Sequence, residues 1–344
     1  MKAKINEIAN LFLKERGRSF LSFEQIGSGL IHSTFLVEDL KGEKYILQNI
    51  NTTVFTSIDS LRGNLLTLNS FEENKTPSNT ALNYLKHSGR IFLEDVHREI
   101  WRMYDFIPGL VYQTVQSINQ ATISANALAR FHHDHIGIDL SSIESPIKDF
   151  TNFQCRIDKL TEALSKGNAR RIIENTIFTE VLLAQMDCID AFIKIEKTIP
   201  RRLIHGDPKI SNFIFSEESL TIRAFIDLDT IMVGTVLYDF GDMIRSFTNK
   251  SAETDSLTTN VFNSELYDAI LSSYLEAGQF FLSKEEVGLL PVGALAVCLI
   301  QAIRFYTDYL NGDVYYQIKN KDDNLIRAKN QFQLYLELKD YLDS

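Results

Sequence analysis

The spacing of apolar residues divides the chain into a β-rich beginning and a helical remainder. Apolar residues three and four positions apart predict a short amphipathic helix within the first 20 residues. Short apolar runs bounded by glycine and polar residues then predict strands, and a helical spacing interrupts them once. The expected strands cover residues 23–26, 34–38, 45–50, 89–94 and 100–106, and the helix covers residues 57–69.

The pattern changes after the segment Ile107-Pro108-Gly109, beyond which the spacing is mainly helical. We expect helices over residues 123–131, 155–197 and from 265 to the C-terminus, with short strands around polar loops at 203–215 and 222–227. The sequence therefore predicts an α+β fold with two lobes. Residues 1–107 form a small antiparallel-sheet lobe, and residues 108–344 form a larger, mainly helical lobe after a proline-glycine hinge.

Composition excludes several classes of protein. A formal net charge of -10 argues against nucleic acid or an anionic membrane as the main partner, because both recruit basic surfaces. The three cysteines form no C-x-x-C pair and no export signal is recognisable, so we expect a cytoplasmic protein. The uncharged stretch over residues 287–303 contains Pro291 and two glycines, which is typical of a buried helix rather than a membrane span.

The strongest chemical pattern is His205-Gly206-Asp207, followed by Asn212 five residues after Asp207 and by Asp227 twenty residues after it. Phosphoryl transfer needs a carboxylate that orients and deprotonates the attacking hydroxyl, and Asp207 suits that role. It also needs hard oxygen ligands for magnesium, which Asn212 and Asp227 offer. Lys209 is placed to neutralise charge on the transferred group.

These residues resemble the aminoglycoside and choline phosphotransferase superfamily, whose fold is that of the protein kinases. The resemblance implies ATP and Mg²⁺ as cofactors, Asp207 as the catalytic base, and Asn212 with Asp227 as metal ligands. The segment Asp239-Phe240-Gly241 is similar to the metal-binding motif of protein kinases, but the Ile226-Asp227 segment already supplies that aspartate. We expect Asp239 to brace the catalytic loop instead.

Residues Gly27, Ser28 and Gly29, with Thr34 after them, lie between two expected strands, where a glycine-rich loop lets the backbone approach phosphates. A Gly-Ser-Gly hairpin without a ligand is the alternative interpretation. The resemblance places the adenine beside the backbone from Tyr104 to Ile107.

One position departs from the common kinase pattern. The third strand carries Gln48 where kinases of this fold usually place a lysine that holds the phosphates, and the helix expected over residues 57–69 contains no glutamate to pair with one. Loss of both members together suggests a coherent variant, because one charge without its partner is costly in a partly buried site. Lys44, on the same face of the strand, is a candidate substitute.

A closer resemblance covers nearly the whole chain. Several segments look like the bacterial N-acetylhexosamine 1-kinases, which share Y-I-L-Q in the third strand and phosphorylate the anomeric hydroxyl of a small-molecule sugar. The segments lie at residues 27–37, 45–51, 205–209, 226–230, 238–242 and 308–313. The resemblance assigns sugar contacts to Arg304 and to Tyr315 or Tyr316, while His32 either faces the sugar or is a solvated turn histidine.

Two alternatives remain open from the sequence. One is a kinase of another small molecule, such as a different hexose, a choline-like amino alcohol or an aminoglycoside. The other is a nucleotide-binding regulator without catalysis, although Asp207, Lys209, Asn212 and Asp227 are all present. The sequence does not rank N-acetylglucosamine against N-acetylgalactosamine, because that choice depends on one hydroxyl, and it leaves the oligomeric state open.

Overall fold

The structure is a computed structural model that describes residues 2–26, 32–73, 82–251, 255 and 259–344. The chain forms two compact units. Unit 1 contains residues 1–110, 138–148 and 214–232, and unit 2 contains residues 111–137, 149–213 and 233–344. The boundary expected after residue 107 lies close to the end of the first segment of unit 1, and two later segments belong to this unit as well.

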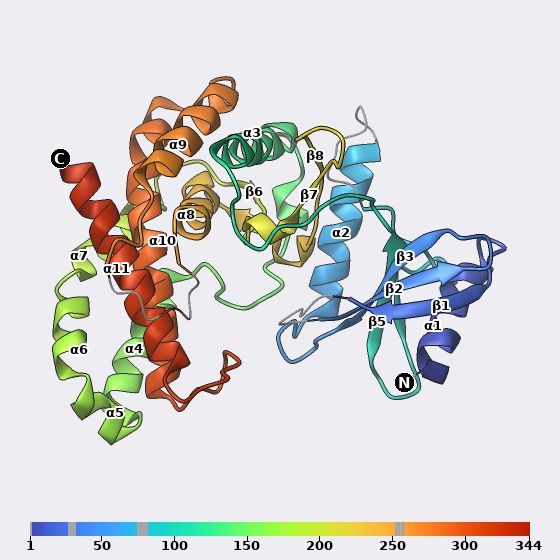
Figure 1. Ribbon diagram of the computed structural model, residues 1–344, viewed down its shortest axis with the longest axis horizontal. Helices are drawn as coiled ribbons and strands as arrows, with labels where there is room; N and C mark the ends of the chain where they lie inside the picture. Colours follow the sequence, from blue (N-terminus) through green and yellow to red (C-terminus); the bar gives the residue numbers. More distant parts are fainter. Residues whose placement is uncertain (1, 27–31, 74–81, 252–254, 256–258) are drawn as a thin grey trace. The chain divides into compact units, whose positions relative to one another are not determined.

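Unit 1 is built on a five-stranded antiparallel sheet with the strand order β1-β2-β3-β5-β4 (Figure 1). The strands are β1 (Phe20–Gln25), β2 (Ser33–Asp39), β3 (Lys44–Ile50), β4 (Phe92–Glu94) and β5 (Ile100–Asp105). The β2-β3 turn contains Gly42 at a φ of 84°, a backbone conformation that glycine adopts without strain. The small antiparallel sheet predicted from the sequence is therefore confirmed.

Helix α1 (Lys2–Lys14) lies against one face of this sheet (Figure 1). Its apolar side includes Ile8 and Phe12, which pack into a cluster with Val37, Leu47 and Met103 from the strands. All five side chains are at most 2% exposed, so this cluster is the core of the sheet region.

Helix α2 (Ile58–Glu73) follows β3, and Ser57 caps it by accepting a hydrogen bond from the Ser60 amide at 3.2 Å. It extends four residues beyond the predicted end at residue 69 and so includes Glu72 and Glu73. The expected absence of glutamate therefore holds for residues 57–69 but not for the whole helix. Unit 1 also contains the 3-10 helices η1 (Leu140–Ser142) and η3 (Leu228–Thr230).

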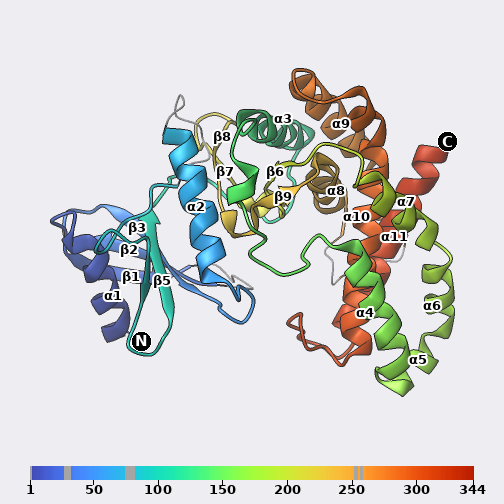
Figure 2. The same cartoon turned by 180° about the vertical axis from the view of Figure 1, so that it is seen from behind.

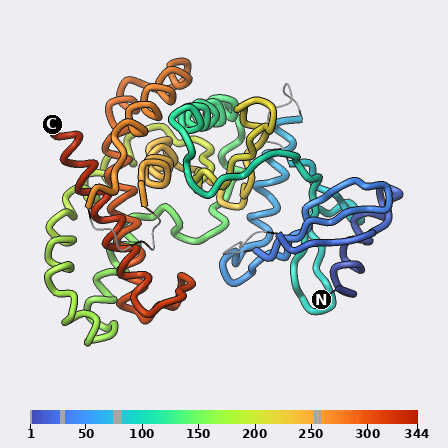
Figure 3. Tube along the Cα trace, in the orientation of Figure 1, coloured from blue at the N-terminus to red at the C-terminus, as the bar shows by residue number. Residues whose placement is uncertain are grey.

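Unit 2 is mainly helical, as predicted, and Figure 2 shows its helices from behind. They are α3 (Ile118–Asp134), α4 (Phe153–Lys166), α5 (Ala169–Glu174), α6 (Thr176–Leu183), α7 (Met186–Ile195), α8 (Val236–Phe247), α9 (Ser264–Gly278), α10 (Lys284–Leu310) and α11 (Asp323–Asp343). Helices α10 and α11 run side by side, which Figure 3 traces from orange to red.

Helix α10 is the central helix of unit 2. A capping box fixes its start: Ser283 Oγ accepts from the Glu286 amide, and the Glu286 carboxylate accepts from the Ser283 amide. The helix begins before Pro291, so that proline lies inside it. This helix is long and apolar enough to cross a membrane, yet 61% of its most apolar window is buried, which favours a core helix.

Four short strands form two further pairs. Strands β6 (Arg202–Ile204) and β9 (Met232–Gly234) pair with each other, as do β7 (Phe213–Phe215) and β8 (Ile222–Phe225). The 3-10 helix η2 (Ile210–Asn212) lies between β6 and β7. The strands near residues 203–215 and 222–227 were predicted, but β9 and α8 were missed.

Helices α8 and α10 pack closely where Gly241 of α8 meets Gly293 of α10. Replacing Gly241 by alanine tests this close packing. A Cβ at Gly241 would lie 2.6 Å from the Gly293 carbonyl oxygen and 2.8 Å from a Val297 methyl. Because the nearest atom is backbone, we expect a loss of about 1–3 kcal/mol in the free energy of unfolding, measured by urea denaturation. Gly288→Ala on α10 is the control, since its Cβ would meet open space. Equal stability of the two variants would contradict this packing.

Candidate active site

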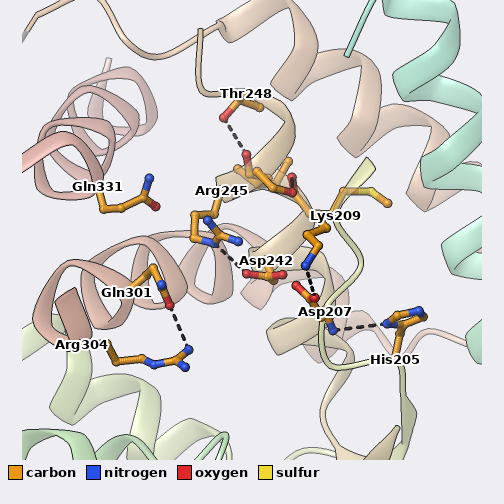
Figure 4. A network of polar contacts seen from close by, with 12 residues as sticks. His205, Asp207, Lys209, Asp242, Arg245, Thr248, Gln301, Arg304 and Gln331 are labelled. Atoms are coloured by element: carbon orange, nitrogen blue, oxygen red, sulfur yellow. Dashed lines mark hydrogen bonds and ion pairs between the residues drawn. The ribbon is translucent and has the colours of Figure 1, made fainter. Parts of the chain in front are cut away.

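The segment His205–Asn212 forms a compact loop in unit 2, between β6 and β7. Gly206 has a φ of 83°, which lets the chain turn directly after the strand. The loop then closes on itself, because the Lys209 amide donates to the Asp207 carbonyl and the Asn212 amide donates to the Lys209 carbonyl, both at 2.9 Å. Figure 4 shows the Asp207 side chain held beside Lys209 on this loop.

Two side chains of the same loop surround the Asp207 carboxylate. Lys209 Nζ lies 2.6 Å from Asp207 Oδ2, and Asn212 Nδ2 donates to this oxygen at 3.2 Å and to the Asp207 carbonyl at 2.7 Å. Burial by itself would raise the pKa of Asp207, but the charge and hydrogen bond of Lys209 outweigh it and lower the pKa below its ordinary value. The structure thus brings together three of the predicted site residues.

Asp239, at the start of α8, holds this loop in place through hydrogen bonds. Its carboxylate accepts hydrogen bonds from the amides of His205 at 2.7 Å and Gly206 at 2.8 Å. His132 Nε2 lies 2.9 Å from the same carboxylate, and His132 Nδ1 lies 2.8 Å from the Tyr274 hydroxyl. Asp239 is fully buried and both of its oxygens accept hydrogen bonds from the loop backbone, so its expected bracing role is confirmed.

Asp227 lies in unit 1, in the turn between β8 and η3. It adopts a left-handed conformation with φ 59° and ψ 45°, which is uncommon for residues with a side chain and is tolerated best by Asp and Asn. Two residues later, Asp229 is fully buried and its carboxylate is bound by Arg102 and His32. The turn that presents Asp227 is therefore anchored from within the same unit.

The donor atoms fit the magnesium ion that the resemblance implies. Asp227 contributes a carboxylate, and Asn212 uses its amide nitrogen toward Asp207, so its carbonyl oxygen is the atom left to meet a cation. In unit 1, ligand atoms of His32, Asp227 and Asp229 lie within 4.8 Å of one another. Asn212 and Asp227 belong to different units, and their metal roles stay predictions.

The residues predicted to bind the nucleotide lie in unit 1. Gly27, Ser28 and Gly29 fall outside the residues that the structure describes. Thr34 on β2 accepts a hydrogen bond from Gln48 Nε2 at 3.1 Å, and Tyr104 on β5 is 7% exposed with its ring 5.6 Å from that of Tyr84.

Ile107 follows the end of β5 and is partly buried. The adenine contacts assigned to Tyr104 and Ile107 stay predictions.

His32 is neither solvated nor turned toward open space. Its Nδ1 accepts a hydrogen bond from the Asn51 amide at 3.1 Å, so its Nε2 carries the proton and donates to Asp229 at 2.7 Å. Its ring lies 5.1 Å from that of Phe55, and the residue is only 7% exposed. The solvated-histidine alternative is wrong, and the contacts favour an anchoring role over the predicted sugar contact.

Arg304 and its aromatic neighbours lie in unit 2. The Arg304 guanidinium lies over the rings of Phe150 at 5.3 Å and Tyr316 at 5.9 Å, and it donates to Gln301 Oε1 at 2.9 Å. Figure 4 shows this pair on α10, with Asp242 and Asp207 drawn in the same network. Of the two tyrosines that the resemblance offered, Tyr316 has its ring beside Arg304, whereas Tyr315 is 55% exposed.

Two further polar side chains of this region were missed by sequence reasoning. Arg156 donates to the Phe150 carbonyl at 3.2 Å, and its buried Nε has no hydrogen-bond partner among the described residues. Asp242 pairs with Arg245 at 2.7 Å, while its buried Oδ2 has no such partner. Burial, and then the nearby Asp207, raise the pKa of Asp242 against the effect of Arg245. Asp242 stood in a recognised motif, whereas nothing distinguished Arg156 from other helical cations.

A sequence profile of the phosphotransferase enzyme family matches residues 22–269 of the 344. The chain belongs to this family. The match includes the loop with Asp207, the turn with Asp227 and the bracing residue Asp239.

Solved structures support the fold of this phosphotransferase. A choline kinase from Cryptosporidium parvum Iowa II is similar over 99% of this chain and 96% of its own, with 14% identity and a TM-score of 0.61. A spectinomycin phosphotransferase in complex with ADP and spectinomycin covers 98% and 96%, with 12% identity and a TM-score of 0.62. Amicoumacin kinase, solved with AMP-PNP and Ca²⁺, covers 98% and 96% at 14% identity and 0.62. The protein-kinase-like α+β fold is thereby confirmed.

Proposed function

We propose that this phosphotransferase transfers the γ-phosphoryl group of ATP to the anomeric hydroxyl of an N-acetylhexosamine. The sequence resemblance motivates the substrate, and the ADP and AMP-PNP found in two structural neighbours support the nucleotide. Small-molecule acceptors are common to the neighbours, but choline is cationic and a hexosamine is neutral. The groups of the protein that would contact the acceptor therefore bear on the choice between these two substrates.

The observation that carries the proposal is the pair of guanidinium groups of Arg304 and Arg156. Among the described residues, neither Arg304 nor Arg156 has a carboxylate within ion-pair distance. Burial, and then repulsion from Arg304, lower the pKa of Arg156, so the two guanidinium groups lie close enough to interact. Hydroxyl and carbonyl oxygens of an acetylated sugar accept hydrogen bonds from such groups, whereas the quaternary ammonium group of choline offers them no acceptor.

Arg304 is linked to the proposed base through its neighbours. Tyr238 lies within electrostatic reach of Asp242, Arg304 and Asp207, and burial raises the pKa of its hydroxyl. A sugar held at Arg304 and Tyr316 would therefore be in the region of unit 2 that also contains Asp207. Tyr316 would supply the aromatic surface that the apolar face of a sugar ring needs.

The proposed reaction uses the groups of the catalytic loop in a simple order. Asp207 orients the anomeric hydroxyl and accepts its proton while the oxygen bonds to the γ-phosphorus and the bond to ADP breaks. Lys209 stabilises the negative charge that is shared among the phosphoryl oxygens. Magnesium bound by Asn212 and Asp227 would neutralise phosphate charge when present.

A panel of acceptors tests the proposal. Purified protein with Mg-ATP is offered N-acetylglucosamine, N-acetylgalactosamine, glucose, choline, ethanolamine and an aminoglycoside, and ³¹P NMR identifies the product. We expect a sugar 1-phosphate from the acetylated hexosamines only. Phosphorylation of choline, ethanolamine or the aminoglycoside without any sugar phosphate would overturn the substrate assignment.

Replacing Arg304 by alanine should weaken sugar binding more than nucleotide binding. Loss of a hydrogen bond to a charged group is worth about 1.5–3 kcal/mol, so we expect KM for the sugar to rise roughly 10- to 150-fold. KM for ATP should change less than threefold. The control is Arg170→Ala, because Arg170 is an exposed helix cation paired with Glu174. Equal effects of Arg304→Ala on both substrates would contradict a sugar-binding role.

The pH profile should report the influence of Lys209 on Asp207. A lowered pKa keeps Asp207 ionised as the pH falls, so in the natural protein loss of activity from its protonation begins only near or below its ordinary value of about 4. Lys209→Met removes the largest lowering influence, and the acid limb of kcat/KM should move to higher pH. An unchanged acid limb in this variant would show that Lys209 does not control the base.

A further inference from the structure

Gln48 and Arg102 face each other across the middle of the unit 1 sheet. They are paired positions of β3 and β5, and Arg102 Nε and Nη2 both donate to Gln48 Oε1, at 2.9 and 2.7 Å. Arg102 is 2% exposed. A buried cation therefore lies directly beside the position where related kinases carry a strand lysine. Lys44, the substitute that we considered, starts the strand four residues away, at roughly 13 Å along it.

The other side of the Arg102 guanidinium binds Asp229. Nη1 donates to Asp229 Oδ1 and Nη2 donates to Oδ2 at 2.7 Å, which is the bidentate arrangement of a strong arginine-carboxylate pair. His32 Nε2 donates to Asp229 Oδ2 as well. Both oxygens of this fully buried carboxylate are thus bound by protein cations or donors, which favours an anchor rather than a metal ligand.

This anchor holds the turn that contains Asp227. Asp227 stands two residues before Asp229 in a left-handed conformation, and such conformations persist only where the surroundings determine them. A second contact holds the residue directly after η3, because Asn64 Nδ2 on α2 donates to the Ile231 carbonyl at 3.0 Å. The backbone that follows Asp227 is therefore held at two points, at Asp229 within η3 and at Ile231 directly after it.

We propose that Arg102 is a positioning residue that compensates for the missing strand lysine: it ties Gln48 to Asp229 and so places Asp227 for the metal-bound nucleotide. It does so without touching phosphate, because its donors face Gln48 and Asp229. His32 supports the same carboxylate from the other side. The inference rests on the metal role given to Asp227 under the proposed function.

The decisive measurement separates metal-bound from metal-free nucleotide. Isothermal titration of the full chain, without any acceptor, gives Kd for ADP with Mg²⁺ and for ADP with EDTA. For Arg102→Met and Arg102→Lys we expect Kd with Mg²⁺ to rise about 10- to 100-fold, as for a lost charge-assisted hydrogen bond, with lysine affected less. Kd without metal should stay within threefold of the natural protein. Arg62→Met, on the exposed side of α2, is the control.

Several outcomes decide the proposal. A residue that bound phosphate directly would weaken both Kd values equally, and a residue with only a structural role would change neither in a folded variant, so either result overturns the inference. Arg102→Met leaves Asp229 buried and without this cation, and such a variant can fail to fold. In that case Arg102→Lys, shown to be folded by circular dichroism, is used for the same titration. His32→Asn is a milder change at the same carboxylate, and it should raise Kd with Mg²⁺ in the same direction.

The failure of the proposed function gives a different result. In that case the acceptor panel yields no sugar phosphate, while the ratio of the two Kd values still responds to Arg102. If the natural protein binds ADP equally with and without Mg²⁺, then no metal is positioned by Asp227 and the inference is wrong.

Discussion

Asp207→Asn is expected to lower kcat by about 10²- to 10⁴-fold, which is the usual contribution of a general base. The amide retains the shape of the carboxylate and still meets Asn212, but it cannot accept the proton of the acceptor hydroxyl. KM for both substrates should change little, because the variant removes an interaction of the transition state. Steady-state kinetics with N-acetylglucosamine and Mg-ATP measure the loss.

The control for this variant is Asp190→Asn, an exposed aspartate on α7. Circular dichroism should show that both variants are folded. An Asp207→Asn variant with more than a tenth of the natural kcat would mean that another group takes the proton. Asp207 would then not be the catalytic base.

The second large effect is expected at Asp239. Replacing it by alanine removes the carboxylate that accepts from the buried amides of His205 and Gly206 and that contacts His132 Nε2. We expect the free energy of unfolding to fall by about 3–5 kcal/mol, as when one partner of a buried charged network is removed. Urea denaturation gives this value, provided that the slope of the transition is unchanged.

Asp239→Asn distinguishes bracing from metal binding. Its remaining carbonyl oxygen can still accept from one amide, so the loss of stability should be smaller than for alanine. If Asp239 bound metal instead, the affinity for Mg²⁺-nucleotide would fall while the stability stayed near that of the natural protein. That pattern would contradict the contacts seen at His205 and Gly206.

Elements with a local cause were predicted well. The loop around Asp207 closes through hydrogen bonds between residues two to five positions apart, so the types and spacing of a single short segment determine it. The strands of the unit 1 sheet and the helices with one apolar side were likewise visible from their periods.

Helix α8 was missed for a physical reason. Eleven of its twelve residues are buried, and they include the polar Asp239, Asp242 and Arg245, so the polar side of this helix was interpreted as a chemical motif. Its Gly241 looked like part of a metal motif, whereas the structure gives this glycine a packing role against Gly293. A buried polar side contacts distant segments of the chain, and a single sequence does not reveal those contacts.

The amino-acid sequence by itself determined the family pattern, the fold class and the three groups of the catalytic loop. Only the tertiary structure decided what accompanies Gln48. Arg102 lies 54 residues from Gln48 and 127 from Asp229, and His32 lies 197 residues from Asp229. Hydrogen bonds over such separations depend on strand register and on the packing of distant segments, which no local pattern records. The missing lysine was visible in the sequence, but its replacement required the fold.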